Sequence, residues 1–259
     1  MVITTAELTA YVGSLLWPLF RVGALILSAP VFGARMVPMR VRAGLSVLVT
    51  LAMLPVLPIP PAVDVFSAAS VMIIAQQILI GVMMGFALQI VLSAVITGGQ
   101  LIAMQMGLGF AAMVDPQNGA QTPVLSQFYV VMVILVFLSL NGHLVMFEVL
   151  HDSFVSMPIG KAVMSTDGLW LLIHWSGQLF AGAVGMAIPA IASLLIVNFA
   201  FGIMTRAAPQ MNIFAIGFPI TLLLGFGVIV ATLPSVVPHS TNLFNDAYHL
   251  IRNIIAGTA

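Results

Sequence analysis

The chain carries no charged side chain between Val65 and Val114, and this stretch runs into a dense series of helix breakers, GGQLIAMQMGLGFAAMVDPQNGAQTP, from Gly98 to Pro123. About 20 apolar residues cross the hydrocarbon core of a bilayer, so most of the uncharged stretch has the length of membrane helix. Backbone that leaves the helix at such a depth is tolerated only inside protein or against water. The break therefore predicts a pore or a translocation path, and function is to be sought there.

Composition supports a membrane protein. Of the 259 residues, 61% are hydrophobic and only 5% are charged, against roughly 25% charged residues in a soluble domain. Cysteine is absent, which excludes disulfides, thiolate metal sites and cysteine nucleophiles. The net charge of zero gives no reason to expect nucleic acid as a partner. No Lys or Arg precedes Arg21 and the first apolar segment leads into further ones, so no cleaved signal peptide is expected.

Hydropathy predicts a single unit with six membrane segments and no internal repeat. The prolines between Pro55 and Pro61 end the second segment early and favour a partly extended chain there. Pro189 and Pro219 are expected to interrupt the fifth and sixth segments. The fold class is therefore all-α integral membrane protein with broken helices. The six segments are residues 8–32, 43–57, 68–96, 124–147, 169–201 and 213–237.

The basic residues predict the orientation of the chain in the membrane. Arg35, Arg40 and Arg42 follow the first segment, and Arg206 lies between the fifth and the sixth. An even number of crossings separates the two groups, so they share one side, which the positive-inside rule makes cytoplasmic. The N-terminus then faces outward. The opposite face receives Asp64, Glu148, Asp152, Asp167 and Asp246.

Glycine pairs mark places where membrane helices could approach closely. Gly81 and Gly85 form a GxxxG pair, and Gly182 with Gly185 and Gly225 with Gly227 also reduce the helix surface. A general richness in glycine explains each pair equally well, so the sequence leaves specific contacts open.

One polar set resembles a metal or acid/base site. Glu148, His151 and Asp152, near Asn141 and His143, are spaced to share a helix face. Their spacing is not an established zinc signature, so we expect them to mark the end of the fourth segment, where the chain meets water. No nucleophile elbow, Walker-type loop or nucleotide fingerprint is present in the sequence. Neither an enzyme nor a cofactor is therefore expected.

The central break has the chemistry of a flexible apolar seal. Methionine repacks cheaply around irregular shapes, and Gly107 and Gly109 permit backbone conformations closed to other residues. Asp115, followed by Pro116, favours a turn. The apolar residues of the break are Met104, Met106, Leu108, Phe110 and Met113. A gasket that seals a wide conduit and an ordinary buried re-entrant turn both fit this pattern.

Four blocks of sequence, in order along the chain, closely resemble the FliR family of type III secretion export-gate proteins, which also includes the T subunits of virulence injectisomes. GLGFA, followed by DP and GxQ, is typical of the flagellar branch. The blocks are SAPVFGARMVPMRVR (Ser28 to Arg42), GGQLIAMQMGLGFAAMVDPQNGAQTPVLSQF (Gly98 to Phe128), NGHLVMFEVLHDSFVSMPIG (Asn141 to Gly160) and RAAPQMNIFAIGFPI (Arg206 to Ile220).

The resemblance implies one copy of this chain in an export gate that FliP-type and FliQ-type subunits complete. Residues 1–168 would form a P-like portion with a plug loop near 106–122. Residues 169–259 would hold a Q-like helical hairpin, with Arg206 at its cytoplasmic tip, and the C-terminus. The assembled gate would stand largely out of the bilayer. The plug would comprise Met106, Gly107, Leu108, Gly109, Phe110, Met113 and Asp115.

In function, the resemblance implies a passive conduit for unfolded flagellar substrates in the bacterial inner membrane and flagellar basal body. FlhA-type and FlhB-type membrane proteins would be neighbours. The alternatives are an injectisome T subunit and an ion-coupled secondary transporter in which Asp115 takes part in binding. A membrane-embedded hydrolase that uses Glu148 and His151 is a third alternative.

Overall fold

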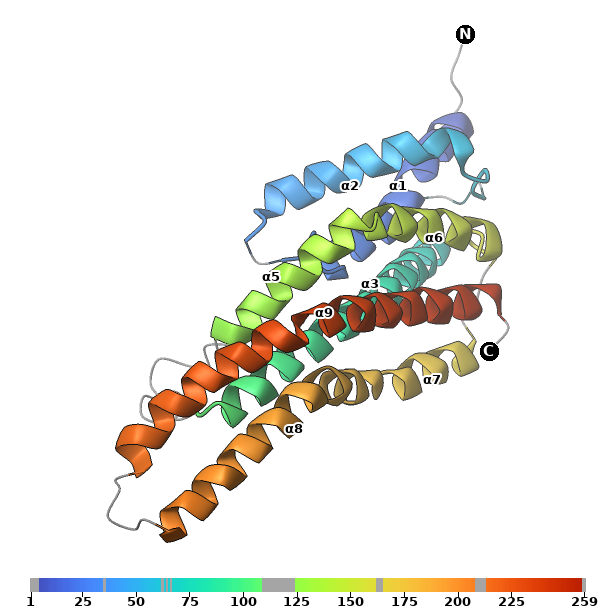
Figure 1. Ribbon diagram of the computed structural model, residues 1–259. Coiled ribbons are helices and arrows are strands. Elements are labelled where there is room, and N and C mark those ends of the chain that lie inside the picture. Colours follow the sequence, from blue (N-terminus) through green and yellow to red (C-terminus); the bar gives the residue numbers. More distant parts are fainter. Residues whose placement is uncertain are drawn as a thin grey trace. The chain divides into compact units, whose positions relative to one another are not determined.

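A computed structural model describes residues 5–34, 36–61, 63, 65, 67–108, 124–161, 165–207 and 213–257. Every regular element within these ranges is helical, which confirms the predicted all-α class (Figure 1). The elements are α1 (Thr5–Ser28), α2 (Met39–Met53), the 3-10 helix η1 (Leu54–Val56), α3 (Ala68–Gln105), α5 (Val124–Ser139), α6 (Gly142–Ser156), α7 (Thr166–Trp175), α8 (Gln178–Ala207) and α9 (Ile213–Ala256).

Several of these helices have the length and composition of membrane spans. Four stretches qualify among the described residues: Met39–Val56, Ala68–Gln105, Thr166–Ala207 and Pro219–Ala256. The bent pair α5 and α6 would make a fifth, whereas the apolar part of α1, Val12–Ser28, is shorter. The chain is thus an integral membrane protein, with four or five helices of spanning length where hydropathy predicts six segments.

Two of the predicted segments each divide into two helices, at a pair of adjacent residues that are small or polar. The fourth divides into α5 and α6, which meet at an angle of 65°. Asn141 lies at this bend with a positive φ of 58°, and Gly142 follows it. The fifth segment divides into α7 and α8, which Ser176 and Gly177 separate.

Prolines interrupt the long helices less than predicted. Helix α8 continues through Pro189, and α9 continues through Pro219, Pro234 and Pro238. The predicted interruptions are therefore wrong. A proline removes one backbone hydrogen bond and kinks a helix, but neighbouring groups in a membrane bundle can satisfy the freed carbonyl. The prolines do end the second segment, because η1 ends at Val56 and the next residue, Leu57, has an extended backbone.

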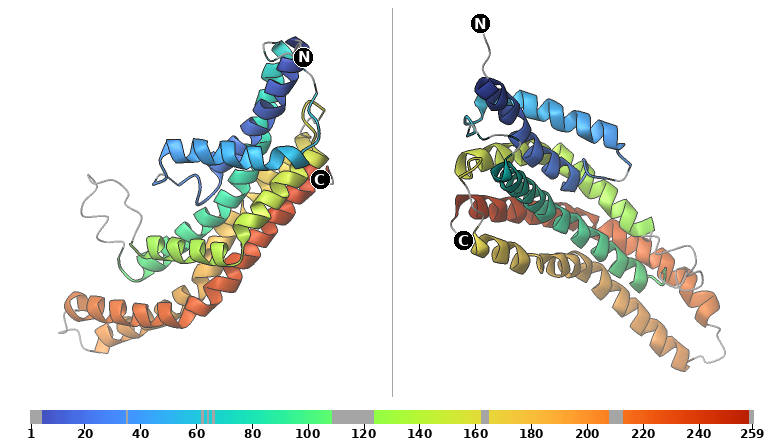
Figure 2. Two further views of the ribbon diagram at one scale, coloured as in Figure 1. Left: turned by 90° about the horizontal axis from the view of Figure 1, so that it is seen from above. Right: turned by 180° about the vertical axis from the view of Figure 1, so that it is seen from behind.

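The described helices belong to two compact units. The first contains α1, α2, α3 as far as Ile90, α6, α7 and α9 from Phe244 onward. The second contains α3 from Val91, α5, α8 and α9 as far as Leu243 (Figures 1 and 2). The expected division into P-like and Q-like portions at residues 168 and 169 concerns likeness to other subunits and stays a prediction.

Close helix contact in the first unit depends on the predicted GxxxG pair. A side chain at Gly81 would collide with the backbone of Arg21 in α1, and one at Gly85 would lie 2.8 Å from the backbone nitrogen of Ala29. Only glycine allows α3 to approach α1 this closely. The Gly81 and Gly85 pair is therefore a specific contact.

Candidate functional site

The candidate site is the end of α3, which three other helices of the second unit contact. Gly98 faces α8, where an added Cβ would lie 3.0 Å from the carbonyl oxygen of Ala183. Gly99 faces α5, where an added Cβ would lie 2.8 Å from the Cα of Ser126. The successive glycines thus let two helices pack onto neighbouring faces of α3.

The third contact joins Met106 to α9. The side chain of Met106 is only 1% exposed. A Cβ at Gly225 would lie 2.6 Å from its Cε atom and 2.8 Å from its Cγ atom. Gly225 therefore provides the space that Met106 occupies, whereas nothing lies within 4 Å of a Cβ at Gly227. Of this predicted glycine pair, only Gly225 makes a close contact.

Helix α3, which ends at Gln105, is capped by a Schellman motif with Gly107 in the left-handed position. Gly107 has a φ of 83°, and its N–H donates to the carbonyl of Met104 at 3.0 Å. The N–H of Leu108 donates to the carbonyl of Ala103, also at 3.0 Å. These two bonds satisfy carbonyls that the helix end would leave unpaired, and glycine takes the left-handed conformation at the lowest cost. The chain thus leaves the helix at a defined residue, next to the buried Met106.

The predicted plug begins at this helix end. Met106, Gly107 and Leu108 lie in the last turn and the cap of α3. Gly109, Phe110, Met113 and Asp115 lie outside the described residues. The assignment of these residues to a channel plug stays a prediction.

The predicted cytoplasmic arginines have different surroundings. Arg42 binds the loop after α1, because its Nε donates to the carbonyl of Val37 and its Nη2 to that of Ala34, each at 2.9 Å. Arg40 in α2 and Arg206 in the last turn of α8 are exposed. Arg35 lies outside the described residues.

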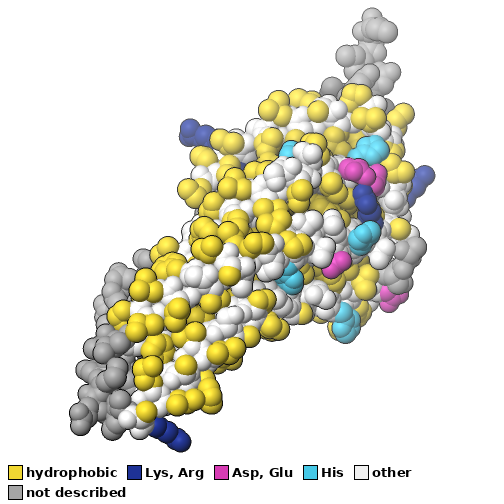
Figure 3. Space-filling view, viewed as in Figure 1, with side chains coloured by type: hydrophobic (Ala, Val, Ile, Leu, Met, Phe, Trp, Pro, Cys, Tyr) yellow, Lys and Arg dark blue, Asp and Glu magenta, His cyan; other side chains and the backbone are white. Residues whose placement is uncertain are grey.

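The polar set of α6 contains one exposed ion pair and one looser contact. Arg252 of α9 donates to Glu148 at 2.8 Å, and His151 lies 3.6 Å from Asp152. Figure 3 shows acidic, basic and histidine side chains gathered over α6, α7 and the end of α9. Among the residues described, no three His, Cys, Asp or Glu side chains are placed to hold a metal ion. That the set is structural stays a prediction.

Arg21 is a buried residue that sequence reasoning did not single out. It is 0% exposed, and its Nε donates to Gln77 Oε1 in α3 at 2.8 Å. Its Nη1 and Nη2 donate to the carbonyls of Ser153 and Met157 at 2.7 and 2.9 Å, and its Cζ lies 4.2 Å above the ring of Phe154. Arg21 thereby caps the C-terminal end of α6, where a positive charge is favourable. An arginine inside an apolar segment was the available signal, because such residues are rare and usually have a role.

Comparison with known proteins identifies relatives of this chain over almost its whole length. The family described as bacterial export proteins, family 1, matches residues 12–247. The flagellar biosynthetic protein FliR of Escherichia coli K12 is 38% identical over 254 residues, which cover 98% of this chain and 97% of the relative. The FliR protein of Pectobacterium carotovorum is 39% identical over 249 residues, covering 96% and 95%. The FliR protein of Bacillus subtilis 168 is 27% identical over 239 residues, covering 91% and 92%.

The helices and the break at Gly107 define an all-α membrane protein whose longest uncharged helix ends among packed neighbours. Within that class, the chain belongs to family 1 of the bacterial export proteins and is a member of the FliR group. It is therefore a subunit of the flagellar export apparatus, which confirms the resemblance and the main functional prediction.

Proposed function

We propose that this chain forms part of the export channel and closes it until an unfolded flagellar substrate passes. The observation that carries the proposal is the end of α3. Three helices contact this end. Gly107, which has a positive φ, follows the helix, and the Gly- and Met-rich segment of the sequence begins at Gly109. An apolar constriction blocks ions by dewetting. A segment anchored in this way can seal a conduit without any ligand.

The proposed setting is a hetero-oligomeric type III export gate in the bacterial inner membrane, at the flagellar basal body. FliP-type and FliQ-type subunits would complete the gate, and FlhA-type and FlhB-type membrane proteins would lie beside it. The supporting observations are the export family and the flagellar names of the relatives. Those names also favour the flagellar branch over an injectisome.

We further propose that the chain is a passive conduit and no enzyme. Of the residues that a hydrolase would use, Glu148 pairs with Arg252 at 2.8 Å, which leaves its carboxylate less available as an acid or base. Partners would then supply the driving force for export.

The proposal is tested by shortening the plug. Removal of residues 109–113 leaves Gly107 and Leu108 in place to end α3. The assembled complex should then conduct ions in a planar bilayer when no substrate is present, whereas the wild-type complex should stay closed. Phe110→Leu with Met113→Leu is the matched control, because it keeps the segment apolar and should keep the channel closed. Phe110→Ser with Met113→Ser should open a leak.

Two results would count against this proposal. A shortened variant that assembles fully and stays as tight as wild type would favour the buried re-entrant turn. Loss of export in Asp115→Asn, without a leak and with normal assembly, would favour the ion-coupled transporter.

A further inference from the structure

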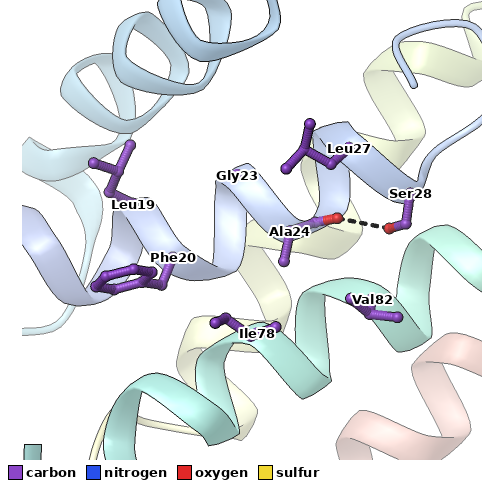
Figure 4. Close-up of a pocket in the computed structure, with 8 residues that line it drawn as sticks. All are labelled: Leu19, Phe20, Gly23, Ala24, Leu27, Ser28, Ile78 and Val82. Atoms are coloured by element: carbon purple, nitrogen blue, oxygen red, sulfur yellow. Dashed lines mark hydrogen bonds between the residues drawn. The ribbon is translucent and has the colours of Figure 1, made fainter. Parts of the chain in front are cut away.

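The first unit contains an apolar groove between α1 and α3 that the export function does not account for. Its volume is about 360 Å³, within the roughly 300–1,000 Å³ of small-ligand pockets. Figure 4 shows side chains from both helices around it. The residues that matter here are Leu19, Phe20, Gly23 and Leu27 of α1 and Ile78 and Val82 of α3.

The groove offers an occupant almost nothing to hydrogen-bond. The one side-chain hydroxyl in its lining belongs to Ser28, and it donates to the carbonyl of Ala24 at 2.7 Å (Figure 4). Leu27, Ile78 and Val82 are 40–43% exposed. The part of an occupant that lies here must therefore be apolar along its whole length.

One end of the groove leads to basic side chains. Gly33, in the loop after α1, folds back onto the carbonyls of Leu27 and Ala29. The next residue, Ala34, accepts a hydrogen bond from Arg42 at 2.9 Å. Contacts thus connect Leu27, which lines the groove, to the guanidinium of Arg42. Arg40, in the same first turn of α2, is exposed.

The positive charge at this end has no acidic counterpart nearby in the sequence. No Asp or Glu occurs between Arg21 and Val63, whereas Arg35, Arg40 and Arg42 fall within that interval. An apolar groove connected to two arginines, in a stretch of sequence without acidic residues, matches a molecule with an apolar chain and an anionic head. Anionic lipids attract basic side chains at a membrane surface in this way.

We propose that the groove binds one acyl chain of an anionic phospholipid, whose headgroup phosphate lies at Arg40 and Arg42. The acyl chain covers the α1 and α3 faces, and the headgroup neutralises the two arginines. This inference depends on the chain being a membrane protein and not on the plug.

The proposal is tested by native mass spectrometry of the export complex extracted from cells and then titrated with phosphatidylglycerol or phosphatidylcholine. The wild-type complex should retain a phospholipid and prefer phosphatidylglycerol. Gly23→Leu fills the groove and should remove this bound lipid. Gly44→Leu is the matched control, since nothing lies within 4 Å of a Cβ at Gly44 on α2. If Gly23→Leu fails to assemble, Val82→Phe fills the groove from the α3 side.

The headgroup is tested separately. Arg40→Gln should weaken phosphatidylglycerol binding about fivefold and leave phosphatidylcholine binding unchanged. Arg206→Gln removes an exposed arginine at the end of α8 and should change neither. Equal lipid retention by wild type and by both groove-filling variants would overturn the proposal, and so would an Arg40→Gln variant that keeps its lipid preference.

A photoreactive side chain at Leu27 identifies the occupant directly in cells. A phospholipid adduct supports the proposal. A protein adduct in its place means that a partner subunit covers the groove, and it overturns the proposal whatever the channel variants show.

Discussion

Arg21 shows how a single buried charge joins elements that are distant in sequence. Its guanidinium binds α3 through Gln77 and the end of α6 through Ser153 and Met157. A guanidinium reaches all three because its donors form a planar fork, which the ammonium of lysine lacks.

We predict that Arg21→Met lowers the stability of the chain by about 3 kcal/mol, because Gln77 and the carbonyl of Met157 lose the donor that Arg21 provides and the carbonyl of Ser153 loses one of its two donors. Arg21→Lys should have a smaller effect in the same direction. Thermal denaturation of the purified complex in detergent measures both, with the exposed Arg206→Met as control. If Arg21→Met proves as stable as wild type, the cost of burying the guanidinium offsets the gain from its hydrogen bonds.

Gly225 and Gly227 provide a matched pair for the contact with Met106. Alanine favours a helix by about 1 kcal/mol over glycine, so Gly227→Ala should stabilise α9 slightly. Gly225→Ala should instead destabilise it relative to Gly227→Ala, by about 1–2 kcal/mol, because the new methyl group displaces Met106. Thermal denaturation compares the two. The cost of Gly225→Ala should be smaller when it is measured in a Met106→Ala background than in the wild-type background. If the effects of the two substitutions are fully additive, the contact between Met106 and Gly225 is contradicted.

At the scale of elements, polar and small residues break two predicted segments, whereas the prolines inside α8 and α9 do not end those helices. Asn141 with Gly142 marks the bend between α5 and α6, and Ser176 with Gly177 marks the break between α7 and α8. Hydropathy treated both places as continuous segments, because two residues hardly change the average over a membrane-length window. In contrast, α9 continues through three prolines.

The capping motif after α3 gives a prediction about Gly107. Asparagine enters the left-handed region far more readily than a β-branched residue. Gly107→Asn should therefore preserve the Schellman motif at a cost of about 1 kcal/mol, and Gly107→Val should cost clearly more. The amount of assembled complex and its resistance to limited proteolysis measure the difference. Equal behaviour of the two variants would show that α3 can end elsewhere without loss.

At the scale of the whole molecule, the lengths of the helices exceed what a bilayer requires. Helix α3 has 38 residues and α9 has 44, which correspond to about 57 and 66 Å at 1.5 Å per residue. The hydrocarbon core is about 30 Å thick. Each of these helices is therefore about twice as long as the core is thick.

The orientation can be tested directly because the chain has no cysteine. Ala207→Cys, beside Arg206, should resist a membrane-impermeant maleimide added to cells with a permeabilised outer membrane. Asn245→Cys, which is exposed near Asp246, should react. The reverse pattern, in cells with an intact inner membrane, would overturn the predicted topology.

The sequence by itself determined that this protein lies in a membrane, that its fold is all-α and that it belongs to the export family. Scarcity of charge over whole segments requires a membrane, and four ordered blocks of residues indicated the export family. The predicted end of the third segment, residue 96, was wrong, because α3 continues through Gly98 and Gly99 to Gln105 and Gly107 follows it with a positive φ.

Only the tertiary structure decided which of these residues touch. Met106 and Gly225 are far apart along the chain, and so are Arg21 and Ser153. No local pattern distinguishes Gly225, which accommodates a side chain, from Gly227, which does not. The physical reason is that close packing and buried hydrogen bonds depend on the atoms a neighbouring helix presents, whereas hydropathy and helix capping act within one helix.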